Sequence, residues 1–122
     1  MKQRVHSVSY LAKAEFEFKN GVYDLVAIPS GAEVVKVSLE VVGNSSTVGN
    51  VSVGFKDENT KDYFLTLDLR GAQTNKNATS AKDYTATSNK VVVAEVESAN
   101  GTDVKGVLRV LYFLPSVVEV EY

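Results

Sequence analysis

Hydrophobic and polar residues alternate along most of the chain, and a helical period of about 3.6 residues is hard to find in any segment. The clearest case is "EVVKVSLEVV", residues 33–42, in which four aliphatic side chains share one face: Val35, Val37, Leu39 and Val41. Lys36, Ser38 and Glu40 fall on the opposite face. This pattern predicts a β-strand with one buried side.

The same alternation predicts strands in most of the remaining chain. We expect them at residues 13–18, 22–28, 50–56, 62–70, 90–97, 106–114 and 117–122. Clusters of Gly, Pro, Asn, Asp and Ser separate these segments, at a spacing typical of an all-β sandwich or barrel. The least hydrophobic stretch, residues 71–90, predicts a long exposed loop or an edge hairpin.

The N-terminal region carries a hairpin signal. An Asn-Gly pair lies between 13–18 and 22–28, which predicts that these two strands are neighbours. Residues 4–10 form either a further strand or an extended arm. We therefore divide the chain into 1–20, an N-terminal strand or interaction arm, and 21–122, a single β-sandwich domain.

Composition narrows the possible partners and the cellular compartment. The chain has 13 basic and 15 acidic residues, a net charge of -2, which favours neither nucleic acid nor an anionic membrane. The chain has no cysteine, so no disulfide framework can form. The N-terminus lacks the continuous apolar stretch of a signal peptide, and no apolar run approaches the ~20 residues of a membrane helix. We therefore expect synthesis in a cytoplasm.

Few residues are suited to catalysis or to metal binding. His6 is the sole histidine, and its polar-face position beside Val5 and Ser7 is more typical of a surface or interface residue than of a catalytic base. One histidine without any cysteine also provides too few ligands for a zinc site. Acid and base chemistry would depend on carboxylate pairs: Glu15 with Glu17, Asp57 with Glu58, Glu95 with Glu97, and Glu119 with Glu121. The pairs at alternate positions are typical of a solvated strand face. The segment "KDENTKD", residues 56–62, lacks the spacing of a calcium loop.

Sugar binding would require exposed aromatic rings. The candidates are Tyr10, Tyr23 and Tyr84, and each fits packing at a sheet margin at least as well. The residues thus predict no catalytic site, no metal and no cofactor.

Three stretches together resemble a known family. They are "AIPSGAEVVKVSLEVV", "NVSVGFKDENTKDYFLTLDL" and "NGTDVKGVLRVLYFLP". They are similar to a pattern in accessory virion proteins of tailed bacteriophages, chiefly head decoration or cement proteins and small jelly-roll fibre or spike modules. The resemblance implies a β-sandwich of jelly-roll type, a homotrimer on the particle surface, and binding as its whole activity.

The resemblance also implies where the protein acts. A cement protein would bind the major capsid protein on the outside of the capsid and stabilise the head, whereas a fibre, spike or carbohydrate-binding module would recognise a host-surface ligand. Residues 1–19 would reach the capsid or a neighbouring subunit, or else form the first strand of the domain. The expected contact residues are Lys2, Arg4, His6, Tyr10 and Lys13.

Overall fold

The structure, a computed structural model, is built from β-strands. It describes residues 8–43, 48–56, 60–69, 77–100 and 104–114 in full, and 2–6 and 117–121 as backbone. The strands are β1 (Lys2–His6), β2 (Ser9–Glu17), β3 (Gly21–Ile28), β4 (Glu33–Val42), β5 (Val48–Phe55), β6 (Leu65–Asp68), β7 (Asn77–Ser80), β8 (Tyr84–Thr85), β9 (Lys90–Asn100), β10 (Lys105–Phe113) and β11 (Val117–Glu121). No helix within these ranges is long and apolar enough to cross a membrane.

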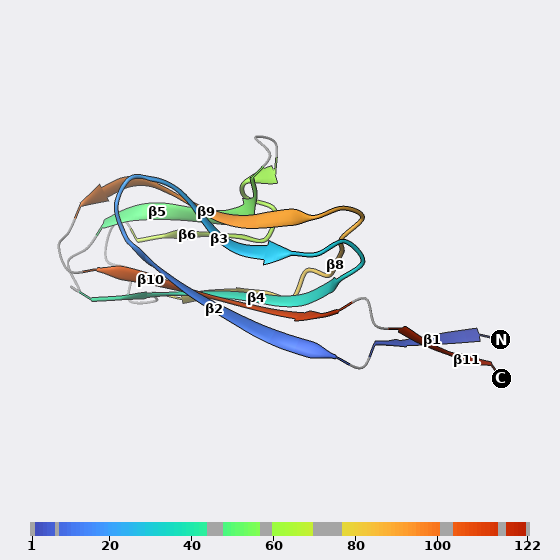
Figure 1. Ribbon diagram of the computed structural model, residues 1–122. Helices are drawn as coiled ribbons and strands as arrows, with labels where there is room; N and C mark the ends of the chain where they lie inside the picture. The colour runs from blue at the N-terminus through green and yellow to red at the C-terminus, as the bar shows by residue number, and fades with distance from the viewer. Residues whose placement is uncertain are drawn as a thin grey trace.

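Two antiparallel sheets pack face to face (Figure 1). The five-stranded sheet has the order β2-β10-β4-β7, with β8 also paired to β4, and the four-stranded sheet has the order β3-β9-β5-β6. Successive strands often belong to opposite sheets, so the chain winds around the core as it does in double-sheet jelly rolls. The predicted fold class, a single all-β antiparallel sandwich, is confirmed, and the expected jelly-roll form stays a prediction.

The two ends of the chain form a third, separate sheet. Strands β1 and β11 pair antiparallel, and this terminal ribbon projects from one end of the sandwich with both termini on it (Figure 1). Strand β2 instead lies in the five-stranded sheet, paired with β10 along its whole length. The segment 1–20 is thus divided between the terminal ribbon and the sandwich.

The core consists of the inward side chains of both sheets. Val51, Val53 and Phe55 of β5 are buried, as the alternation predicts, and Leu65, Leu67 and Leu69 continue the same layer. At about 25 cal/mol per Å² of buried apolar area, such aliphatic layers supply most of the driving force for folding. The result is a rigid body on whose surfaces binding residues can be placed.

The predicted buried face of β4 is wrong at its first residue, Val35. Val34 and Val37 are both fully buried (0% exposed), whereas Val35 is half-buried. The pairing of β4 with β10 shifts at this point, so that Lys36 lies opposite Leu111 and the next pair skips Val35. A β-bulge inserts one extra residue and reverses the alternation, which a strict period of two cannot predict.

The predicted hairpin between 13–18 and 22–28 is also wrong. Strand β2 pairs with β10 and β3 pairs with β9, so the chain changes sheets at Asn20 and Gly21. A two-residue type I′ turn needs positive φ at both positions, but only Gly21 has it, at 149°. The Asn20 side chain instead accepts a hydrogen bond from the backbone of Ala99 at 2.8 Å, which fixes the crossing.

Candidate binding surfaces

The carboxylate pairs lie on the outer faces of the sheets. Glu15 and Glu17 are exposed on the five-stranded sheet, and Glu17 pairs with Lys19 at 3.1 Å. Glu95 and Glu97 lie on the four-stranded sheet, where Glu95 pairs with Lys61 at 3.3 Å. The two pairs are therefore on opposite sides of the molecule and cannot act on one substrate.

The remaining carboxylates add no cluster in the part of the chain that is described. Asp57 and Glu58 lie outside the described residues, and Glu119 and Glu121 are described only as backbone. Among the described side chains, no three acidic or histidine residues come close enough together to hold a metal ion.

Each candidate tyrosine packs against another ring of the same chain. The Tyr10 ring lies 5.9 Å from that of Tyr112, and the Tyr23 ring lies 5.3 Å from that of Phe16. The Tyr84 ring lies 4.5 Å from that of Phe55. The hydroxyl of Tyr23 also donates to the backbone oxygen of Lys19 at 2.7 Å, so these rings have structural partners at the sheet margins.

The outer faces of the two sheets differ in chemistry. The outward positions of the four-stranded sheet are mostly polar, including Asn50, Ser52, Thr66, Glu95 and Glu97, with Val22 (46% exposed) of β3 as an aliphatic exception. The five-stranded sheet instead mixes exposed aliphatic side chains, Leu11 (63%) and Val42 (49%), with charges of both signs. An outer face that exposes aliphatic groups among charged ones is the better candidate for protein contact.

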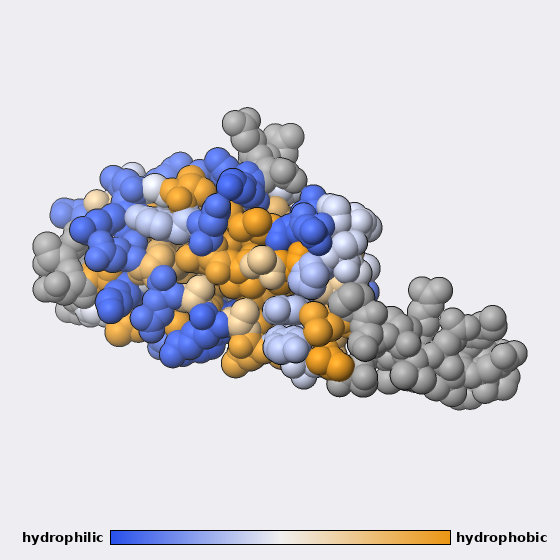
Figure 2. Space-filling view, in the orientation of Figure 1, coloured by the Kyte–Doolittle hydropathy of each residue, from blue (hydrophilic) through white to orange (hydrophobic). Residues whose placement is uncertain are grey.

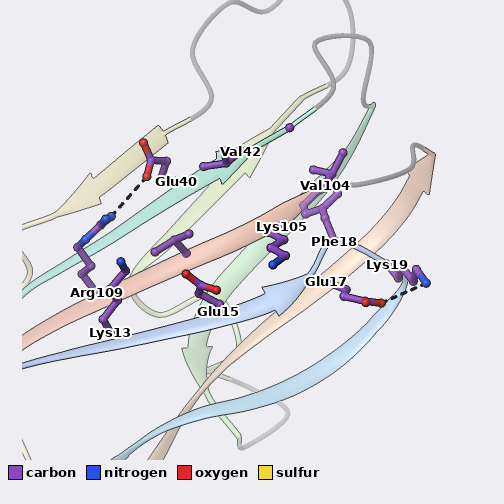
Figure 3. Close-up of a pocket in the computed structure, with 12 residues that line it drawn as sticks. Lys13, Glu15, Glu17, Phe18, Lys19, Glu40, Val42, Val104, Lys105 and Arg109 are labelled. Atoms are coloured by element: carbon purple, nitrogen blue, oxygen red, sulfur yellow. Dashed lines mark ion pairs between the residues drawn. The ribbon is translucent and has the colours of Figure 1, made fainter.

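A hollow of about 500 Å³ lies on this outer face of the five-stranded sheet, lined by side chains of β2, β10 and β4. Arg109 and Glu40 point toward one another and form an ion pair at 3.6 Å, and Lys13 and Glu15 lie along β2 beside them (Figure 3). Cations and anions alternate here, so the hollow suits a protein surface of mixed charge better than a single anion.

Exposed hydrophobic residues gather where the terminal ribbon joins the sandwich. Val8 is 37% exposed, Tyr10 49% and Leu11 63%. Leu11 lies opposite Leu111 in the β2–β10 register, and Leu114 donates a backbone hydrogen bond to Val8 at 2.8 Å. Consecutive side chains of a strand point to opposite faces, so Tyr10 and Leu11 lie on the two faces of this end of β2. We call the three residues at this end, Val8, Tyr10 and Leu11, the basal patch.

One side of the sandwich is open. Strands β2 and β3 are the last strands of their sheets on this side, and a hollow of about 710 Å³ lies along them. Phe16, Val22 and Leu25 contribute apolar surface to it. Hydrophobic residues are visible along the middle of the molecule, between the sheets, in Figure 2.

The structure places the expected contact residues in two groups. Lys2, Arg4 and His6 belong to β1 in the terminal ribbon, and Tyr10 and Lys13 belong to β2. Lys13 is exposed on the outer face of the five-stranded sheet, and Tyr10 lies in the basal patch.

Strand β11 shares the terminal ribbon with β1, a pairing that the alternation of residues did not predict. The register pairs Lys2 with Glu121 and Arg4 with Glu119. The sequence did contain a signal for this pairing. Two basic residues near the N-terminus and two acidic residues near the C-terminus are each separated by one residue, and opposite charges that face each other stabilise an antiparallel pair.

Comparison with known proteins gives the family. No family model and no curated protein matches the chain. Among solved structures, a chain of the acid-stable capsid of Helicobacter pylori bacteriophage KHP30 is 74% identical, with a TM-score of 0.90 over 100% of both chains. A chain of the cyanophage Pam1 capsid shares the fold at 21% identity, with a TM-score of 0.68 over 88% of this chain and 85% of that one. The protein therefore belongs to the same family as the KHP30 capsid component, a family of accessory bacteriophage virion proteins.

Proposed function

We propose that the protein is a capsid decoration or cement protein, which binds the major capsid protein on the outer surface of the head as a homotrimer and has no catalytic activity. The observation that carries the proposal is the 74% identity, over the full length of both chains, to a component of a capsid described as acid-stable. A shell that resists acid needs strong contacts between its subunits. A small binding protein can supply them by burying area across the junctions between capsomers.

The terminal ribbon is suited to reach the capsid. It has only two strands of five residues each, and each strand has one edge without a partner in the described chain. An isolated two-stranded ribbon is marginally stable in water, and its free edges can accept a strand from another protein. A capsid segment added to the ribbon would stabilise both partners through main-chain hydrogen bonds.

Four of the five expected contact residues fit this arrangement, whereas Lys13 lies apart from it on the outer face of the five-stranded sheet. Lys2, Arg4 and His6 would contact the capsid from the ribbon, next to the acidic positions of β11. The basal patch, which contains Tyr10, would contact the neighbouring subunits of the trimer, because exposed hydrophobic groups are stabilised when symmetric association covers them.

Truncation of the ribbon tests the proposal. Deletion of residues 1–12 would also cut Ser9 to Ala12 from β2, so the sharper variant removes residues 1–7 and 115–122 and leaves the sandwich strands intact. Purified protein is mixed with capsids that lack it and the mixture is sedimented. We expect the full chain to sediment with the capsids, and the truncated chain to keep its strand signal in circular dichroism yet stay in the supernatant.

The control is Glu97→Lys, a charge reversal on the outer face of the four-stranded sheet, which should bind like the natural chain. Light scattering of the full chain gives its oligomeric state in parallel. Failure of the full chain to bind any capsid would refute the cement proposal. Equal binding by the truncated chain would refute the role of the ribbon.

A further inference from the structure

Strand β2 is a long and regular sheet edge. Within the described chain it pairs only with β10, and all nine of its residues keep one register with that strand. The other edge on the same side, β3, is interrupted by a register shift between Asp24 and Val26. Bulges protect an edge from pairing, and a straight edge without one is a template for a further strand.

Two opposite charges lie near the middle of this edge strand. Lys13 and Glu15 are both exposed on the outer face of the five-stranded sheet, one on each side of Ala14 (Figure 3). Neither forms an ion pair within the described residues, whereas neighbouring Glu17 pairs with Lys19. The edge therefore presents a cation and an anion that have no partner in the described chain.

This order of charges is complementary to itself. In an antiparallel pair of identical strands related by a two-fold axis, one residue lies opposite its own copy and its neighbours exchange places. With Ala14 on the axis, Lys13 lies opposite Glu15 of the second copy, and Glu15 lies opposite Lys13. Opposite charges at directly opposed positions stabilise an antiparallel pair.

The other two-fold registers near the middle of β2 are less favourable. An axis on Lys13 sets two lysines against each other, and an axis on Glu15 sets two glutamates against each other. An axis on Phe16 brings Glu15 opposite Glu17, and an axis on Ala12 leaves Lys13 opposite Leu11. Like charges directly opposed destabilise a pair, so the Ala14 register is selected.

The inward side of the edge also allows a close approach. Ala12 and Ala14 are small and half-buried, and with Ala14 on the axis Ala12 lies opposite the larger Phe16. A second copy at this position would also lie along the open side of the sandwich, beside the hollow that Phe16 lines. Pairing thus adds main-chain hydrogen bonds and reduces the apolar area in contact with water.

We propose that the β2 edge is a contact between two copies of this chain, in which antiparallel pairing centred on Ala14 joins two five-stranded sheets into one. This inference goes beyond the proposed capsid binding and does not depend on it. A two-fold contact cannot close a trimer, so on a particle it would link one trimer to the next and extend the cement layer across the shell.

Charge exchange tests the register. We expect light scattering over a range of concentrations to give an even number of copies for the natural chain, two or six. Lys13→Glu and Glu15→Lys should each halve that mass at the same concentration. Each change places two like charges opposite each other at both of the symmetry-related contacts between residues 13 and 15. The double variant K13E/E15K restores both pairs in exchanged order and should recover the natural mass. Glu97→Lys, on the other sheet, should leave the mass unchanged.

A cysteine cross-link tests the axis directly, because the natural chain has no cysteine. Directly opposed residues of an antiparallel pair have Cα atoms about 4.5–5.5 Å apart, within the range of about 4.4–6.8 Å that a disulfide spans. Ala14→Cys should therefore give a covalent dimer under mild oxidation. Ala12→Cys, which would lie opposite Phe16, should give much less.

Two results would overturn the proposal. One is a mass that none of the charge variants changes, together with the absence of a dimer in Ala14→Cys. The other is a loss of capsid binding in Lys13→Glu with no change in mass, which would assign this edge to a capsid strand. In contrast, a natural chain that pairs through β2 yet ignores capsids would refute only the cement proposal.

Discussion

Gly106 and Phe16 offer the sharpest test of how β2 is held to the sandwich. They lie opposite each other in the β2–β10 register, and the Phe16 ring covers the space where a side chain on Gly106 would stand. A methyl group at Gly106 would lie 2.5 Å from Cε1 of Phe16 and 2.8 Å from Cε2. Phe16 is only 6% exposed and its ring stacks on Tyr23 at 5.3 Å, so it has little room to move.

We therefore expect Gly106→Ala to destabilise the protein by about 1–3 kcal/mol, the usual cost of adding a methyl group to a packed core. Alanine is otherwise favoured over glycine in a strand by roughly 0.5–1 kcal/mol. Phe16→Leu removes the ring atoms that the new methyl group would meet, and should itself cost about 1–2 kcal/mol through lost burial. In the Phe16→Leu background, Gly106→Ala should be neutral or slightly stabilising.

The assay is urea unfolding followed by tyrosine fluorescence and circular dichroism, since the chain has six tyrosines and no tryptophan. All four proteins of the double-mutant cycle are compared at one protein concentration, because association contributes to apparent stability. We expect a coupling free energy of about 1–3 kcal/mol with equal m-values. A cost of Gly106→Ala that is the same in both backgrounds would refute the proposed contact.

Two further predictions concern the connections between strands. Gly54→Ala places a methyl group 2.6 Å from backbone atoms of Lys61 and Tyr63, so the loop must lift from the sheet. We expect a loss of about 1–3 kcal/mol in urea unfolding and faster amide exchange at Phe64, whose backbone donates to Val53 at 2.9 Å. Asn20→Ala removes the acceptor for Ala99 and should cost about 0.5–1.5 kcal/mol, whereas Asn20→Asp retains an acceptor and should cost less.

The proposed function depends on surfaces rather than on a cleft with reactive groups. Carboxylates of the two outer faces lie on opposite sides of the sandwich, and the candidate tyrosines pack within the chain. The distinctive surfaces are the terminal ribbon, the basal patch and the β2 edge. Each exposes strand edges or hydrophobic groups that another protein can cover, which fits a component of a shell.

The sequence by itself determined most of the strands and which side of most of them is buried, but not the short strands β7 and β8, which lie in the segment predicted as a loop or hairpin. Alternation places Val51, Val53 and Phe55 in the core because side chains of a strand point to opposite faces in turn. Turn-forming residues marked the breaks between strands for equally local reasons, since they depend on the φ angles that each residue allows. The fold class followed from these two local signals.

Only the tertiary structure decided which strands are neighbours. Strand β2 pairs with β10, 88 to 104 residues later in the chain, because burial of both sheet faces outweighs the local preference of an Asn-Gly pair for a hairpin. The bulge at Val35 likewise depends on the partner strand. The terminal ribbon and the β2 edge also result from long-range pairings. Alternation within one segment does not identify the partner of that segment, although the matched charges of the two chain ends were a signal for the ribbon.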